Sequence, residues 1–161
     1  MRTIATALAF AAALVVAAPC VAAAPDPGDL TDMQVLRKQV ADEDDKRKLV
    51  EAVLKLTPAE AKKFWPIYEK YQNSLEMTDR KRSVALEGLI GRDKALSDRY
   101  AKSLATELEQ VETAESTARH TMYKRVMKAL PPRKAARYIQ LEQKARAVQQ
   151  YDIAVAFPLV Q

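Results

Sequence analysis

The amino-acid sequence predicts an all-α protein made of long helices. Only 3 of its 161 residues are glycine, 29% are charged, and Ala, Leu, Lys, Glu and Arg are abundant. This composition is typical of long helices rather than of sheets. No window alternates apolar and polar residues as a half-buried strand does. A chain of this length is expected to form one domain at most.

The N-terminal residues have the pattern of a secretory signal peptide. A single arginine near the start precedes an apolar run over residues 4–18, and small residues follow it. Cleavage is expected after Ala23. Cleavage after Ala24 is the other choice, and it is disfavoured because Pro25 would then lie just beyond the scissile bond.

Two other interpretations of this N-terminal segment have less support. A membrane anchor needs an apolar stretch of about 20 residues, and none follows. A lipidated Cys20 is disfavoured because "AAPC" lacks the expected leucine and places proline before the cysteine. We therefore expect a signal peptide at 1–23 and a single all-helical domain at 24–161 in the periplasm. That domain has no cysteine, so packing alone must hold it together.

The first helix is predicted over residues 31–55. In "LTDMQ" (30–34), Thr31 is the expected N-cap and Gln34 the third helical residue, which together form a capping box. Leu30 precedes the cap, where it can pack against the following turn. The acidic run at 42–45 reads as a solvated surface rather than as a metal site.

The second helix is predicted over 58–90 and repeats this pattern. Leu56 precedes the expected N-cap Thr57, and Glu60 is the third helical residue of a second capping box. Its apolar seam consists of Phe64, Tyr68, Tyr71, Leu75, Thr78, Leu86 and Leu89, with Arg82 as a polar interruption. Gly91 is the expected residue just beyond its C-terminus.

Two further helices are predicted over 97–129 and 132–150. Ser97 is the expected N-cap of the third helix, and "LPP" at 130–132 separates it from the fourth. The apolar tail that follows is too short to span a membrane.

Pro66 lies ten residues after Leu56, the residue that precedes the second capping box. It cannot donate a hydrogen bond to the carbonyl of Lys62, so a kink is expected there. The bent helix either wraps its own core or presents a curved surface whose concave side binds a partner. We expect Phe64 and Tyr68 on the core seam and Trp65 and Ile67 closer to a binding face.

Several short motifs together resemble the periplasmic Spy/CpxP family, which is named after its LTxxQ elements. The chain contains "LTDMQ" (30–34), the looser "LTPAE" (56–60), a degenerate "LPPRK" (130–134), "FWPIYEKYQ" and a tail with "FPLV". The chain looks like an uncharacterised branch of this group. The resemblance implies long, bent antiparallel helices in a hairpin-like cradle, usually as a homodimer. Family members include ATP-independent chaperones, inhibitors of stress-sensing kinases and metal-responsive proteins.

Catalysis has little support in the sequence. The chain has one histidine, no cysteine after cleavage, no glycine-rich phosphate loop and no serine in a nucleophile elbow. His120 alone cannot define a metal site, so it is expected to face solvent or a partner. We therefore predict no enzyme activity, no cofactor and no metal.

The charge distribution is more informative. Residues 124–146 contain eight basic residues and one acidic residue, a net charge of +7 in a chain whose total is +5. Nucleic acid is an unsuitable partner for an exported protein, so anionic membrane surfaces or acidic stretches of client proteins are preferred. The alternative is a solvated basic face that a neighbouring helix or a dimer mate neutralises.

These observations lead to two functional hypotheses. The first is a chaperone that binds unfolded or misfolded envelope proteins without ATP on a curved basic and apolar surface, at Trp65, Ile67, Arg133, Lys134 and Arg137. The second is an envelope-stress signalling protein that modulates a membrane sensor or an anti-sigma protein through the basic segment. The four methionines of the mature chain suit a promiscuous surface, but at helical spacing they are more often part of a core.

Overall fold

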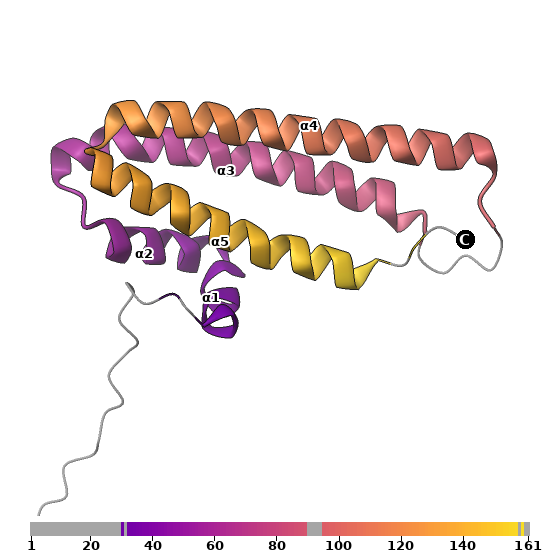
Figure 1. Ribbon diagram of the computed structural model, residues 1–161, viewed down its shortest axis with the longest axis horizontal. Coiled ribbons are helices and arrows are strands. Elements are labelled where there is room, and N and C mark those ends of the chain that lie inside the picture. Colours follow the sequence, from indigo (N-terminus) through magenta and orange to yellow (C-terminus); the bar gives the residue numbers. More distant parts are fainter. Residues whose placement is uncertain (1–29, 31, 90–94, 158, 160–161) are drawn as a thin grey trace, which may run out of the picture.

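The computed structural model describes residues 30, 32–89, 95–157 and 159, and five α-helices occur within them. They are α1 (Met33–Val40), α2 (Glu43–Leu54), α3 (Pro58–Glu87), α4 (Asp98–Ala129) and α5 (Pro132–Ala156). The long helices α3 and α4 form an antiparallel pair, and α5 runs beside them (Figure 1). The prediction of an all-α fold is confirmed. The signal peptide and its cleavage site lie outside the described residues.

The N-terminal helix differs from its prediction. Residues 31–55 are not one helix, because α1 ends at Val40 and α2 begins at Glu43. The N-cap of α1 is Asp32 rather than Thr31, since an Asp32 carboxylate oxygen accepts a hydrogen bond from the backbone N–H of Gln34 at 2.8 Å. Gln34 is thus the second helical residue and not the third, so the predicted capping box was wrong. Thr31 lies outside the described residues.

A second aspartate causes the break between α1 and α2. The side chain of Asp42 accepts a hydrogen bond from the Asp44 amide at 2.9 Å and caps α2. A short carboxylate competes well for free amide groups, so such residues favour helix starts over helix interiors. The acidic first turn that follows is favourable at the positive end of the helix dipole.

The predicted start of α3 is confirmed in detail. The Glu60 amide donates to the Thr57 hydroxyl at 3.3 Å, the Thr57 amide donates to the Glu60 carboxylate at 2.8 Å, and Pro58 is the first helical residue. Leu56 packs against the core. Lys55 closes α2 in the left-handed conformation, with φ of 45°.

The far ends of the helices shift by a few residues. Helix α3 ends at Glu87 with Gly88 as its C-cap, while Gly91 lies outside the described residues. A Cβ atom on Gly88 would collide with the hydroxyl of Tyr100, so a larger residue here would require the Tyr100 side chain to move. Ser97 caps α4 as predicted. Helix α5 continues six residues beyond 150, because no helix breaker precedes Pro158.

The core lies where α2, α3, the second half of α4 and α5 meet. The ring of Phe64 on α3 contacts the ring of Tyr138 on α5 edge to face, with centroids 4.9 Å apart. Met122 and Val126 of α4 are buried in the same cluster. Of the predicted α3 seam, Phe64, Tyr68, Tyr71, Leu75, Thr78 and Leu86 are buried, and Leu89 is half-buried.

Candidate binding groove

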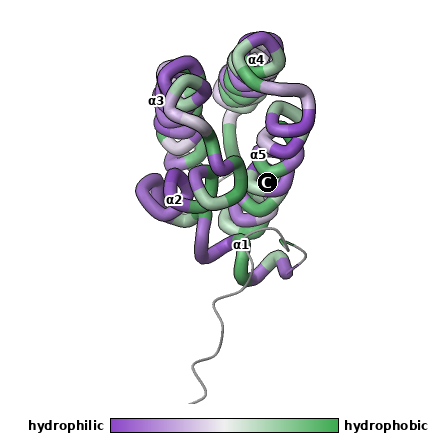
Figure 2. The backbone as a smooth tube through the Cα atoms, turned by 90° about the vertical axis from the view of Figure 1, so that its left-hand side faces the viewer, coloured by the Kyte–Doolittle hydropathy of each residue, from purple (hydrophilic) through white to green (hydrophobic). Residues whose placement is uncertain are grey.

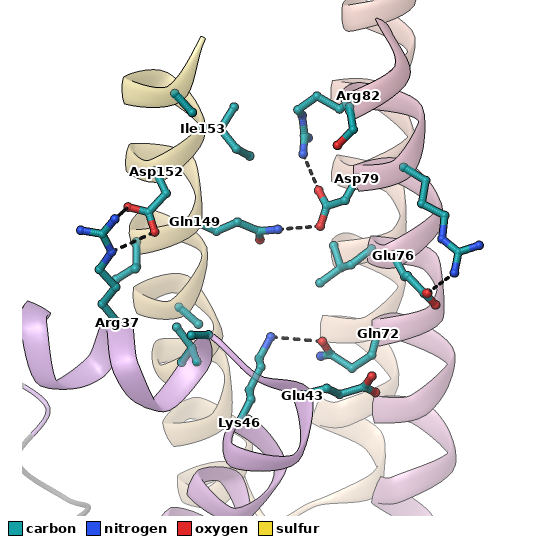
Figure 3. Close-up of a pocket in the computed structure, with 18 of the residues that line it drawn as sticks. Arg37, Glu43, Lys46, Gln72, Glu76, Asp79, Arg82, Gln149, Asp152 and Ile153 are labelled. Atoms are coloured by element: carbon teal, nitrogen blue, oxygen red, sulfur yellow. Dashed lines mark hydrogen bonds and ion pairs between the residues drawn. The ribbon is translucent and has the colours of Figure 1, made fainter. Parts of the chain in front are cut away.

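A groove of about 1060 Å³, the α3–α5 groove, lies between the C-terminal halves of α3 and α5, and residues of α1 and of the start of α2 also line it. Figure 1 shows α5 diverging from α3 toward the C-terminus, and Figure 3 shows the side chains that line the space between them. On α3 the lining runs from Gln72 to Glu87, about 22 Å along the helix axis. On α5 it begins at Ala145 and reaches Phe157 just beyond the helix.

The groove exists because α2 is short. Viewed end-on, α2 and α5 lie below the pair of α3 and α4, with α1 at the bottom (Figure 2). Helix α2 has 12 residues, about 18 Å, and α3 has 30, about 45 Å. The chain before α2 does not continue along α3. It forms α1, which packs on α5 through the Arg37–Asp152 ion pair. The place of a fourth helix is therefore only partly filled.

The walls of the groove are largely apolar. Apolar side chains come from three helices and from the residue that follows α5: Val40, Leu75, Val84, Ala145, Val148, Ile153, Ala156 and Phe157. Val84, in the last turn of α3, is 70% exposed. Burial of such a side chain by a partner is worth about 1.5–3 kcal/mol.

Polar side chains bridge the groove from wall to wall. The Gln149 amide nitrogen of α5 donates to the Asp79 carboxylate of α3 at 2.6 Å, and Figure 3 shows these side chains reaching toward each other. Nearer the core, the ammonium of Lys46 contacts the Glu142 carboxylate at 2.9 Å and the Gln72 amide oxygen at 3.2 Å. These contacts set the separation of α3 and α5.

A buried charge network fixes the helices behind the groove. The Arg82 guanidinium contacts the carboxylates of Glu115 at 2.6 Å and Asp79 at 2.5 Å, and Glu115 also pairs with Arg146. Arg82 and Glu115 are both buried. The polar interruption in the α3 seam is thus one member of a network that joins α3, α4 and α5.

The cations at the groove are all paired. Arg37 pairs with Asp152 at 2.7 Å, Arg80 with Glu76 at 2.5 Å, and Lys46 and Arg82 are held as described. Within the described part of the chain, two carboxylates at the groove, Glu43 and Glu87, have no ion-pair partner. The groove therefore presents excess negative charge.

The predicted binding-face residues Trp65 and Ile67 lie outside the groove lining. Both are half-buried and pack against the core cluster. The guanidinium of Arg47 covers the Trp65 ring, 4.2 Å from its centroid. Pro66 is exposed on a helix that continues unbroken from Pro58 to Glu87.

The predicted basic residues divide into two kinds. Lys134 is half-buried and tied to neighbouring elements, because its ammonium contacts the Glu60 carboxylate at 2.6 Å and the Lys55 carbonyl at 2.8 Å. Lys134 and the Thr57 amide together lower the pKa of Glu60. Arg133 and Arg137 are exposed. None of the three lines the groove.

Arg133 and Arg137 belong to a basic end of the bundle. The α2–α3 and α4–α5 connections meet there (Figure 1), within residues 51–66 and 122–140. Those two stretches contain nine basic and two acidic residues, a net charge of +7, so the rest of the chain carries −2.

Other candidate sites are not assembled in the described residues. In that part of the chain no group of three or more His, Cys, Asp or Glu side chains is placed to hold a metal, and His120 is exposed. The expectation for the methionines was wrong for three of the four: Met122 is buried, while Met33, Met77 and Met127 are exposed.

Sequence reasoning missed the groove because it depends on the break between α1 and α2. A continuous helix over 31–55 would run about 37 Å and would occupy the place that the groove leaves open. The available signal was Asp42 followed by three acidic residues, a pattern typical of a helix start.

Across the described residues, no helix is both long and apolar enough to cross a membrane. Comparisons with known protein families, with characterised proteins and with solved structures find no match. The resemblance to the Spy/CpxP family therefore stays a prediction based on the short motifs alone.

Proposed function

We propose that this protein is a periplasmic, ATP-independent chaperone-like protein that holds apolar segments of unfolded or misfolded envelope proteins in the α3–α5 groove. The observation that carries the proposal is the groove itself, with its apolar walls and the exposed Val84. A space of this size and lining is typical of a binding site rather than of a packing defect.

Exposed apolar side chains near the groove support loose, promiscuous contact. Met77 on α3 and Tyr151 on α5 are each more than 60% exposed. Flexible and aromatic side chains of this kind adapt to partners of different shape. Trp65 and Ile67 remain a second hypothetical client contact, on the same helix but outside the groove.

Suppression of client aggregation tests the function. Purified protein at stoichiometric amounts, without ATP, is expected to suppress the light scattering of a chemically denatured client after dilution. Val84→Asn should weaken the suppression, while the matched Val155→Asn, at a residue of similar exposure outside the groove lining, should not. No suppression by the wild type at any ratio would refute the chaperone function.

A second candidate function is envelope-stress signalling, and the basic end of the bundle favours it. Its exposed cations can dock on an acidic domain of a membrane sensor or an anti-sigma protein. Reversal of Lys128, Arg133 and Arg137 to glutamate should change the output of an envelope-stress reporter. Lys134 is left unchanged because it holds the start of α3. An equal response to reversal of Lys81, Arg99 and Lys102, far from this end, would argue against docking there.

A homodimer is part of the proposal, as the resemblance implies. Sedimentation equilibrium of the purified protein measures this directly, and a strictly monomeric mass at micromolar concentration would remove the dimer from the account.

A further inference from the structure

We propose that the α3–α5 groove accepts an amphipathic helix of about 15 residues with a basic polar face, supplied by the bound protein. This inference rests on the proposed function and specifies the conformation and charge of the client segment.

The first argument is the geometry of the bundle. Helices α3 and α5 line the groove, α4 packs against both of them, and the position opposite α4 holds α2 at one end only (Figures 1 and 2). The open part follows α3 from Gln72 to Glu87, about 22 Å, which corresponds to a helix of about 15 residues. A bound helix would thereby complete a four-helix arrangement along the whole bundle.

The second argument concerns backbone hydrogen bonds. The walls are helices, whose backbone groups bond within themselves and offer no edge to an extended strand. An extended segment buried in the groove would leave its amide and carbonyl groups without partners, at a cost of about 1–3 kcal/mol for each. A helical segment satisfies these groups internally, so the groove selects helices.

The third argument is charge. Glu43 lies at the start of α2 and Glu87 at the end of α3, so the two carboxylates that have no ion-pair partner among the described residues stand toward opposite ends of the groove. The cations at the groove are already paired with carboxylates of the protein. Within the described residues, an incoming helix therefore gains from Lys or Arg side chains near both of its ends, whereas acidic side chains there meet repulsion.

Labelled synthetic peptides of 15 residues test this inference. The first has Leu at i, i+3, i+4 and i+7 spacing with Lys on the opposite face. The second replaces two central residues with proline, and the third replaces Lys with Glu. Fluorescence anisotropy with the full-length protein measures each affinity. We expect the first peptide to bind about tenfold more tightly than either of the others.

Two variants locate the binding and test the charge argument. Glu87→Lys should weaken the basic peptide about threefold to tenfold and improve the acidic one, while Glu109→Lys, on the exposed face of α4, should change neither. Val84→Asn should weaken the basic helical peptide, and Val155→Asn should not. Circular dichroism of all four variants checks that each remains folded.

The outcomes separate the two proposals. Equal binding of the helical and proline peptides by a protein that still suppresses aggregation would refute the helix and leave the chaperone function. Preference for the acidic peptide would refute the charge argument. If no peptide binds and Val84→Asn instead abolishes self-association, the occupant is a second copy of this chain, and the inference is wrong.

Discussion

At the scale of single residues, the centre of the core is notable for buried tyrosines. Tyr68 and Tyr138 are almost fully buried, and burial, with a smaller effect of the nearby Glu142 carboxylate, raises the pKa of both hydroxyl groups. Tyr71 shows the same shift for the same reasons. The hydroxyl groups of Tyr68 and Tyr138 add polar cost to a core that their rings stabilise through edge contacts.

Tyr68→Phe is predicted to leave the stability unchanged or to raise it by about 1 kcal/mol. The Tyr68 hydroxyl has no hydrogen-bond partner among the described residues, so its removal relieves a desolvation cost and keeps the ring contacts. Urea denaturation measures the effect. A loss of more than about 1 kcal/mol would mean that the hydroxyl makes an essential hydrogen bond.

Alkaline conditions should destabilise the protein from about pH 10 upward. The pKa values of Tyr68, Tyr71 and Tyr138 are raised in the folded state, so the unfolded state releases these protons first as the pH increases. Stability then falls with pH, because the native state binds more protons than the unfolded state. Urea midpoints at pH 9 and pH 11 test this, with the tyrosinate absorbance at 295 nm as the direct readout. The same midpoint at both values would contradict the prediction.

At the scale of elements, the sequence predicted helices well where caps and apolar periodicity agree. Thr57, Pro58 and Glu60 form a strong local signal, and α3 begins where they place it. Between residues 31 and 55, the apolar residues before and after Asp42 both fit one continuous helix. Whether the segment forms one helix or two depended on whether Asp42 caps a helix or faces solvent. The break into two helices depends on tertiary contacts of α1 with α5, and the periodicity of apolar residues does not reveal such contacts.

Pro66→Ala is predicted to raise the stability by about 1–2 kcal/mol, since the replacement restores an amide donor within a helix and removes the ring that crowds the preceding turn. Chemical denaturation measures this. Pro66 is exposed and does not line the groove, so the groove account expects unchanged suppression of client aggregation. The curved-surface hypothesis expects weaker suppression. Weaker suppression with intact folding would therefore favour a binding face at Trp65 and Ile67.

At the scale of the whole molecule, the charge network behind the groove connects the three long helices. Acidic residues occur at 107, 109, 112 and 115 in the sequence, and of these Glu115 is buried between Arg82 and Arg146. Only the assembled bundle brings these residues together, because they come from three helices. Sequence periodicity placed Arg82 on the seam correctly but could not identify its partners.

Glu115→Ala is predicted to destabilise the protein by about 3–5 kcal/mol, because it leaves two arginines near the core without their shared carboxylate. Glu109→Ala, at an exposed position on the same helix, should cost less than about 0.5 kcal/mol. Urea denaturation of both variants measures the difference. If the two changes had equal effects, the buried network would not be holding the bundle.

The central claim is that clients occupy the α3–α5 groove, and site-specific crosslinking tests it most directly. A photoreactive residue is placed at position 84 in the groove, at position 155 outside its lining and at position 127 at the basic end, all of them exposed. Each protein is irradiated with a denatured client. The account predicts strong client adducts from position 84 and weak ones from the other two. Adducts of equal yield at all three positions, or strongest at position 127, would contradict it.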